Sequence, residues 1–71
     1  MKKNLDQFID YLQGLGMYDI NKTCILMHPT TMYKILEDIG CEKAGRIDYY
    51  KGWKIAIDPA VPIDAMYTKY S

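Results

Sequence analysis

The first apolar pattern in the chain repeats with the period of an α-helix. Between residues 4 and 15, apolar side chains recur at intervals of three and four, which places on one helix face Leu5, Phe8, Ile9, Leu12 and Leu15. Asn4 can accept hydrogen bonds from free N–H groups at the helix start, and Gln7 completes a capping-box-like pair. Because Gly14 and Gly16 both suit the left-handed position after a helix, we expect the helix to end between them.

A short strand and a second helix follow. Residues 23–28 alternate between two largely apolar faces, which predicts a central strand that helices cover on one side. Pro29 has no N–H group and a fixed φ, so it suits the first turn of a helix. Gly40 is expected to end that helix, whose apolar stripe consists of Met32, Ile35, Leu36 and Ile39.

The last part of the chain predicts strands. Residues 41–45 form a polar loop, and residues 46–58 have the pattern of a hairpin in which Gly52 supplies the positive φ of a tight turn. Residues 64–70 predict a final strand, at an edge of the sheet. The clearest period of two in this region belongs to Trp53, Ile55 and Ile57, which alternate with less apolar neighbours.

These elements predict an α+β fold. We expect a single domain over residues 1–71, with two helices packed on a small mixed or antiparallel sheet of about four strands. The expected order of elements is helix, strand, helix, strand, strand, strand. A chain of this length is near the size at which one hydrophobic core gives only marginal stability.

Composition and charge narrow the classes of partner. The chain is 49% hydrophobic and 25% charged, which is typical of a globular domain. Its formal net charge is zero, which argues against a dominant electrostatic attraction to nucleic acid or anionic lipid. A zero net charge also provides little repulsion between copies, which mildly favours self-association.

The sequence indicates a cytoplasmic protein with reduced cysteines. The two lysines near the N-terminus are followed by polar and acidic residues rather than the apolar region of a signal peptide. No apolar run approaches the roughly 20 residues that a membrane span needs. Without an oxidising compartment, a disulfide between Cys24 and Cys41 is not expected.

Candidate catalytic residues are few. His28 is the only histidine, and neither it nor the cysteines have the spacing of a metal site, so we expect no metal and no cofactor. On one strand, Cys24 and His28 would lie roughly 13 Å apart, too far for a nucleophile and its base. We therefore expect His28 to accept a backbone N–H at the helix start, and we expect no enzymatic activity.

The seven tyrosines are the unusual feature of the composition. One interpretation is a sheet with an exposed face, since tyrosine is favoured in strands. The other is a protein interface, where aromatic side chains serve as amphipathic anchors; its candidate residues are Tyr49, Tyr50, Trp53, Tyr67 and Tyr70. Nucleic-acid binding through the hairpin of residues 46–54 is the weakest alternative, because nearby carboxylates offset its basic residues.

Three short stretches carry a family resemblance: Met27-His28-Pro29, Gly52-Trp53-Lys54-Ile55 and Val61-Pro62. In this order they resemble the axial domain of the tailed-bacteriophage major capsid proteins, whose fold encapsulins share. The resemblance implies a non-enzymatic structural or assembly module, located in the host cytoplasm or the virion, whose partner is itself, a capsid protein or a host protein.

The same resemblance leaves a second function open. The N-terminal arm, extended loop and spine helix of the capsid family have no counterpart here, so the chain is not expected to build a shell by itself. The alternative is a small phage accessory protein that binds and modulates a host protein. Strand, proline and helix in succession are also physically generic.

Overall fold

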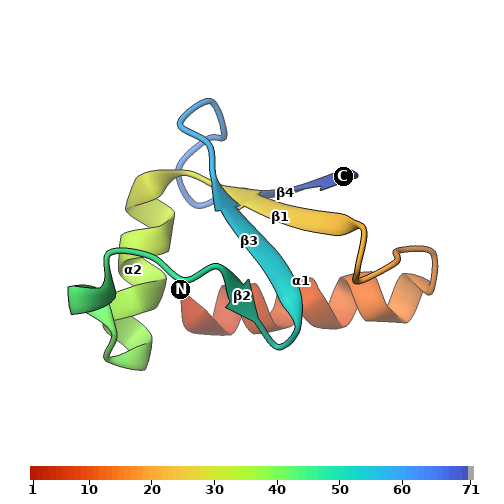
Figure 1. Cartoon of the computed structure of the whole chain (residues 1–71), viewed down its shortest axis with the longest axis horizontal. Helices are drawn as coiled ribbons and strands as arrows, with labels where there is room; N and C mark the ends of the chain where they lie inside the picture. Colours follow the sequence, from red (N-terminus) through yellow and green to blue (C-terminus); the bar gives the residue numbers. More distant parts are fainter. Residues whose placement is uncertain (71) are drawn as a thin grey trace.

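The computed structural model describes residues 1–70, apart from the side chain of residue 42 (Figure 1). Its elements confirm the predicted α+β class and the predicted order. Along the chain they are α1 (Lys2–Leu15), β1 (Thr23–Met27), α2 (Pro29–Ile39), the 3-10 turn η1 (Glu42–Ala44), β2 (Tyr49–Tyr50), β3 (Trp53–Ile57) and β4 (Met66–Tyr70).

The strands form one mixed sheet in the order β2-β3-β1-β4. β1 is parallel to β3 and antiparallel to β4, while β2 and β3 form an antiparallel hairpin. β1 is therefore a central strand, and β4 is an edge strand, as the sequence predicts. In Figure 1, α1 lies beneath the sheet and α2 stands beside it.

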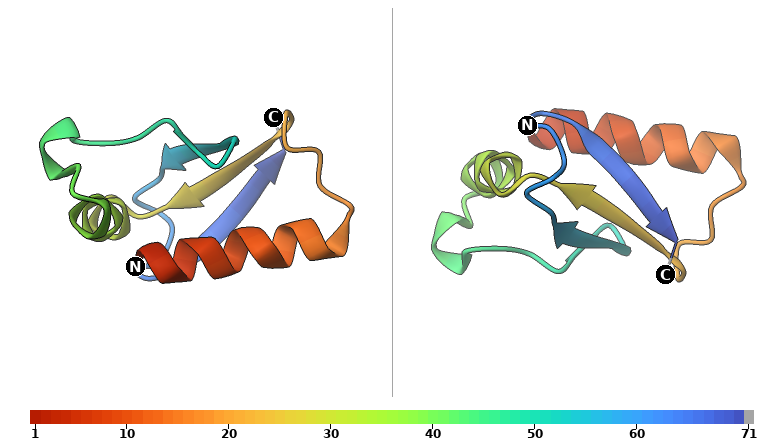
Figure 2. Two further views of the ribbon diagram at one scale, coloured as in Figure 1. Left: turned by 90° about the horizontal axis from the view of Figure 1, so that it is seen from below. Right: turned by 90° about the horizontal axis from the view of Figure 1, so that it is seen from above.

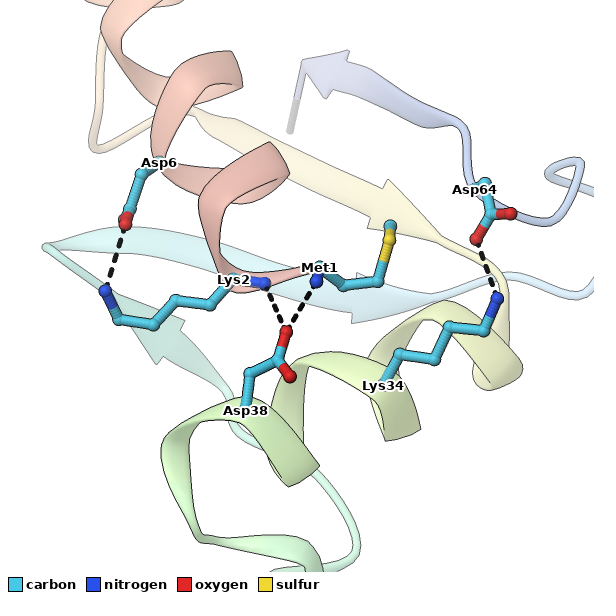
Figure 3. Close-up of polar contacts among 6 residues, drawn as sticks. All are labelled: Met1, Lys2, Asp6, Lys34, Asp38 and Asp64. Atoms are coloured by element: carbon cyan, nitrogen blue, oxygen red, sulfur yellow. Dashed lines mark hydrogen bonds and ion pairs between the residues drawn. The ribbon is translucent and has the colours of Figure 1, made fainter.

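Helix α1 begins earlier than its capping residues predict. The predicted Asn4–Gln7 capping box is wrong, because Asn4 lies inside the helix and the N-cap is Met1. The first N–H groups instead use a distant partner: Asp38 of α2 accepts from the Met1 amino group and, at 2.9 Å, from the Lys2 N–H (Figure 3). A charged acceptor at a helix N-terminus satisfies those donors and complements the helix dipole. The predicted end is confirmed, since α1 stops at Leu15.

Helix α2 has the ends that the sequence predicts. The Nδ1 atom of His28 accepts a 2.9 Å hydrogen bond from the N–H of Thr30, and Pro29 occupies the first turn. Gly40 follows the helix with a φ of 76°, the left-handed value that glycine adopts without strain. Part of the predicted polar loop after Gly40 is the turn η1.

The predicted hairpin is shorter than expected on one side. Only Tyr49–Tyr50 of the predicted strand 46–50 forms β2, although Lys51 and Gly52 have the positive φ values that a tight turn requires. The second half of β3 consequently lacks a neighbouring strand on that edge. Ile57, predicted to point inward, is 37% exposed there.

The start of the last strand also differs from the prediction. β4 begins at Met66 rather than at residue 64, because Asp64 has a left-handed φ of 68°. Asp64 is held there by α2: its N–H donates to Thr31 Oγ1 at 2.9 Å, and its carboxylate pairs with Lys34 Nζ at 3.1 Å (Figure 3).

The hydrophobic core lies between the two helices and one face of the sheet. It contains Leu5, Ile9, Leu12, Ile25, Met27, Met32, Ile35, Leu36, Trp53 and Ile55. The prediction that Trp53 is an interface residue is wrong, because its side chain is 2% exposed and belongs to the core.

Within residues 1–70, neither helix has the length and apolarity needed to cross a membrane.

Candidate protein interface

The register of the strands assigns each side chain to one of two sheet faces, because residues paired across strands point to the same face. The covered face contains Ile25, which pairs with Ile55 and Thr68 and packs in the core. The other face, which we call the open face, consists of Cys24, Leu26, Tyr49, Lys54, Ala56, Tyr67 and Lys69. In the right-hand view of Figure 2, no helix of the described chain crosses these strands.

Two of the five predicted interface residues lie on the open face, on the two outer strands of the sheet. Tyr49 is 65% exposed and Tyr67 is 50% exposed. Lys54 of β3, which pairs with Tyr49, and Lys69 of β4 are also exposed on this face. An exposed face with tyrosines on it matches both interpretations of the tyrosine content, an ordinary solvated face and a contact surface.

The remaining predicted residues lie elsewhere. Tyr50 pairs with Trp53 on the covered side, where Trp53 is part of the core. Tyr70 shares the covered side with Ile25 by register but lies at the end of β4, where its side chain is 73% exposed. The five aromatic residues therefore do not form one continuous surface.

Tyr50 has a structural partner instead. Its hydroxyl donates a 2.8 Å hydrogen bond to Asp6 Oδ1, which also accepts from Lys51 Nζ at 3.0 Å. Lys2 Nζ donates to the other carboxylate oxygen at 3.1 Å. These donors, led by Tyr50, lower the pKa of Asp6 to about 2, while partial burial and the Asp6 contact raise the pKa of Tyr50. The cluster connects α1 to the β2–β3 hairpin.

The outer edge of β4 has free backbone hydrogen-bonding groups. The backbone carbonyl of Met27 accepts a 2.9 Å hydrogen bond from the N–H of Asp58, which directly follows β3. The backbone N–H and C=O groups of Met27 therefore point toward β3. The backbone groups of successive residues point to opposite sides of a strand. Those of Cys24 and Leu26 therefore point toward β4, where they bond to Lys69 and Tyr67. The backbone groups that point away from the sheet then belong to Met66, Thr68 and Tyr70, and no strand of the described chain lies on that side.

A groove runs alongside this edge, between α1 and β4. Its volume is about 390 Å³, and it is lined by Phe8, Tyr11, Leu12, Tyr18, Met66, Tyr67 and Thr68. Tyr11 is 61% exposed and Tyr18 is 37% exposed. The sequence pattern does not single out these two tyrosines as interface residues; its one signal is the spacing of three between Phe8 and Tyr11, which places both on one side of the helix. We call the β4 edge together with this groove the β4 surface.

A second groove of about 260 Å³ lies beside the unpaired end of β3, where its lining includes Met32, Arg46, Asp48 and Ile57. Arg46 and Asp48 form an exposed ion pair at 3.5 Å across this region. Exposed pairs of this kind contribute little stability. This groove is smaller and has no tyrosine in its lining.

The residues considered for catalysis have ordinary structural positions. His28 caps α2, and Cys24 and Cys41 are free thiols, buried and exposed respectively. Among the described residues, no group of three or more histidines, cysteines and carboxylates is arranged to hold a metal ion.

No protein-family model, curated protein or solved structure matches this chain significantly. The relationship to phage capsid proteins therefore stays a prediction from the sequence.

Proposed function

We propose that this protein is a non-enzymatic structural or assembly module that acts through protein–protein contacts, the function that the capsid resemblance implies. The observation that carries the proposal is the open edge of β4. An unpaired strand edge offers a row of N–H and C=O groups with which another chain can pair. β4 contains no proline, and Lys69 is its single charged residue, so it has few of the devices that protect strand edges.

The side chains around this edge support the same function. Three exposed tyrosines, Tyr11, Tyr18 and Tyr67, line the groove together with Met66. Tyrosine and methionine are enriched in protein interfaces, where a tyrosine ring is buried while its hydroxyl keeps a polar partner. An aromatic groove beside an open strand edge combines backbone pairing with a pocket for side chains.

The alternative from the resemblance, an accessory protein that modulates a host protein, would use the same surface. Nucleic-acid binding is less favoured. The open face has two exposed cations, Lys54 and Lys69, and the whole chain has no net charge. Few phosphate contacts give weak, strongly salt-sensitive binding.

Site-specific photo-crosslinking tests the proposal. A benzophenone amino acid is placed at Tyr67 and, as a matched control, at Tyr33 of α2; these side chains are 50% and 53% exposed. The full chain is irradiated in the cells that naturally carry its gene, and adducts are identified by mass spectrometry. We expect a defined protein adduct from position 67 and none from position 33. Equal labelling at both positions, or no adduct at position 67, would contradict the proposed function.

A further inference from the structure

The exposed edge of β4 can be paired with itself. We propose that β4 binds the β4 strand of a second copy of this chain in antiparallel orientation, with Thr68 opposite the partner's Thr68. This inference rests on the proposed function and names the partner. The pairing of the two β4 strands joins the four-stranded sheets of both copies into one continuous sheet, with a two-fold axis between the copies.

The backbone hydrogen bonds fit this register. Met66, Thr68 and Tyr70 direct their N–H and C=O groups away from β1, as the pairing of β1 with its two neighbours establishes. With Thr68 on the axis, Met66 lies opposite the partner's Tyr70, and each of the three residues exchanges both hydrogen bonds with its opposite. No outward group of β4 is then left unpaired.

The side-chain pairs are self-complementary in the same register. On the open face, Tyr67 lies opposite the partner's Lys69, so the lysine stem can cover the ring and the two lysines avoid each other. A register centred on Lys69 would place like charges directly opposite and leave part of β4 unpaired. The threonine pair at the axis is also a favourable cross-strand combination.

The groove gives this register an anchor. Met66 and Thr68 line the groove with Phe8 and Tyr11 of α1. The partner's Tyr70 lies opposite Met66 and points to the side of the sheet that α1 covers, so its ring is placed at the groove. In a single copy, the Tyr70 side chain is 73% exposed. Each copy thereby covers the most exposed ring of β4 in the other, and a thioether–aromatic contact forms twice.

A second copy fits this surface better than an unrelated chain, because its five-residue β4 makes all three kinds of contact at once. It pairs the outward backbone groups, keeps the two lysines apart and places a tyrosine ring at the groove. The formal net charge of zero removes long-range repulsion between copies. A small apolar molecule in the groove would leave the outward backbone groups of β4 unpaired, and an unrelated chain would have to supply both a strand and a ring for the groove.

The mass of the purified full chain in solution tests the inference, measured by sedimentation equilibrium from micromolar to millimolar concentration. We expect a reversible change from 8.3 kDa to twice that mass. The matched variants are Thr68→Glu and Thr68→Gln, which differ in charge but hardly in shape. Two glutamates at the axis repel each other, so Thr68→Glu is expected to raise the dissociation constant at least about tenfold relative to Thr68→Gln. Circular dichroism verifies that both variants fold.

Thr68→Pro provides a second variant, because proline removes an outward N–H and leaves the pairing of β4 with β1 in place. We expect Thr68→Pro to remain at 8.3 kDa throughout. A wild-type chain that stays monomeric at millimolar concentration, or folded Thr68→Glu and Thr68→Pro variants that dimerise like wild type, would overturn the inference. A monomer that still forms an adduct with another protein from position 67 would refute self-pairing alone and leave the proposed function standing.

Discussion

The hydroxyl of Tyr50 donates a 2.8 Å hydrogen bond to the carboxylate of Asp6, 44 residues earlier in the chain. This contact joins the β2–β3 hairpin to α1 and removes Tyr50 from the exposed surface to which its sequence pattern assigns it. With Trp53 in the core, the hairpin contributes mainly to stability, and the β4 surface remains as the place for contacts with other proteins.

The Asp6 contact predicts a loss of stability in acid. The pKa of Asp6 is about 2 in the folded protein and 3.8 for an unperturbed aspartate, so the unfolded state binds protons first as the pH falls. The stabilisation is complete above about pH 4 and declines toward pH 2. Melting temperatures measured between pH 6 and pH 2 should show a smaller decline in Asp6→Asn than in wild type.

Tyr50→Phe serves as the control for this prediction. It removes the largest cause of the lowered Asp6 pKa but keeps the lysine contacts, so its acid dependence should lie between those of wild type and Asp6→Asn. If all three proteins lose stability in parallel as the pH falls, Asp6 is not the group responsible. Asp38, whose pKa the Met1 amino group lowers, would then be the next candidate.

Two glycines predict opposite effects of the same substitution. Gly52→Ala forces a side chain into a position with a φ of 86° and places its Cβ 3.2 Å from Ile20 Cδ1. We expect it to destabilise the protein by more than about 1 kcal/mol. Gly14→Ala, within α1 and with no atom within 4 Å of the new Cβ, should stabilise it by about 0.5–1 kcal/mol. Urea unfolding measures both; equal effects would refute the turn assignment.

A buried hydroxyl predicts a stabilising substitution. Thr23 is 3% exposed, and within the described chain its Oγ1 atom has no hydrogen-bond partner. Thr23→Val keeps the shape and removes the unpaired oxygen, so the free energy of unfolding should rise by roughly 1 kcal/mol. Thr31→Val is the matched control, because Thr31 Oγ1 accepts the Asp64 N–H and its removal should destabilise the protein. Chemical denaturation measures the free energy of unfolding of both variants; a destabilised Thr23→Val would contradict the assignment of an unpaired hydroxyl.

Local patterns were sufficient to predict the elements of this fold. The apolar stripes predict both helices, Gly16 and Gly40 predict where they end, and His28 predicts the cap of α2, because each effect involves residues within a few positions of one another. The position of β4 at an edge also follows from its place at the end of the order of elements.

Contacts between distant residues could not be predicted in the same way. The start of α1 depends on Asp38 of the other helix, which no capping motif near Asn4 indicates. The period of two correctly puts Trp53 and Ile55 on the buried side of β3, but it does not say how far along the strand the cover extends, and Ile57 of the same set is 37% exposed. The groove beside β4 exists only because Tyr11 and Tyr18 meet a strand some fifty residues away, so its sequence signal is weak.

Amide hydrogen exchange of β4, measured by NMR at increasing protein concentration, tests the central claim most directly. In dilute solution the N–H groups of Tyr67 and Lys69, which bond to β1, should exchange slowly, while those of Thr68 and Tyr70 should exchange rapidly. At high concentration the Thr68 amide should become protected, as pairing with a second copy requires. Protection of Thr68 in the dilute monomer, or rapid exchange of Thr68 at every concentration, would contradict the account.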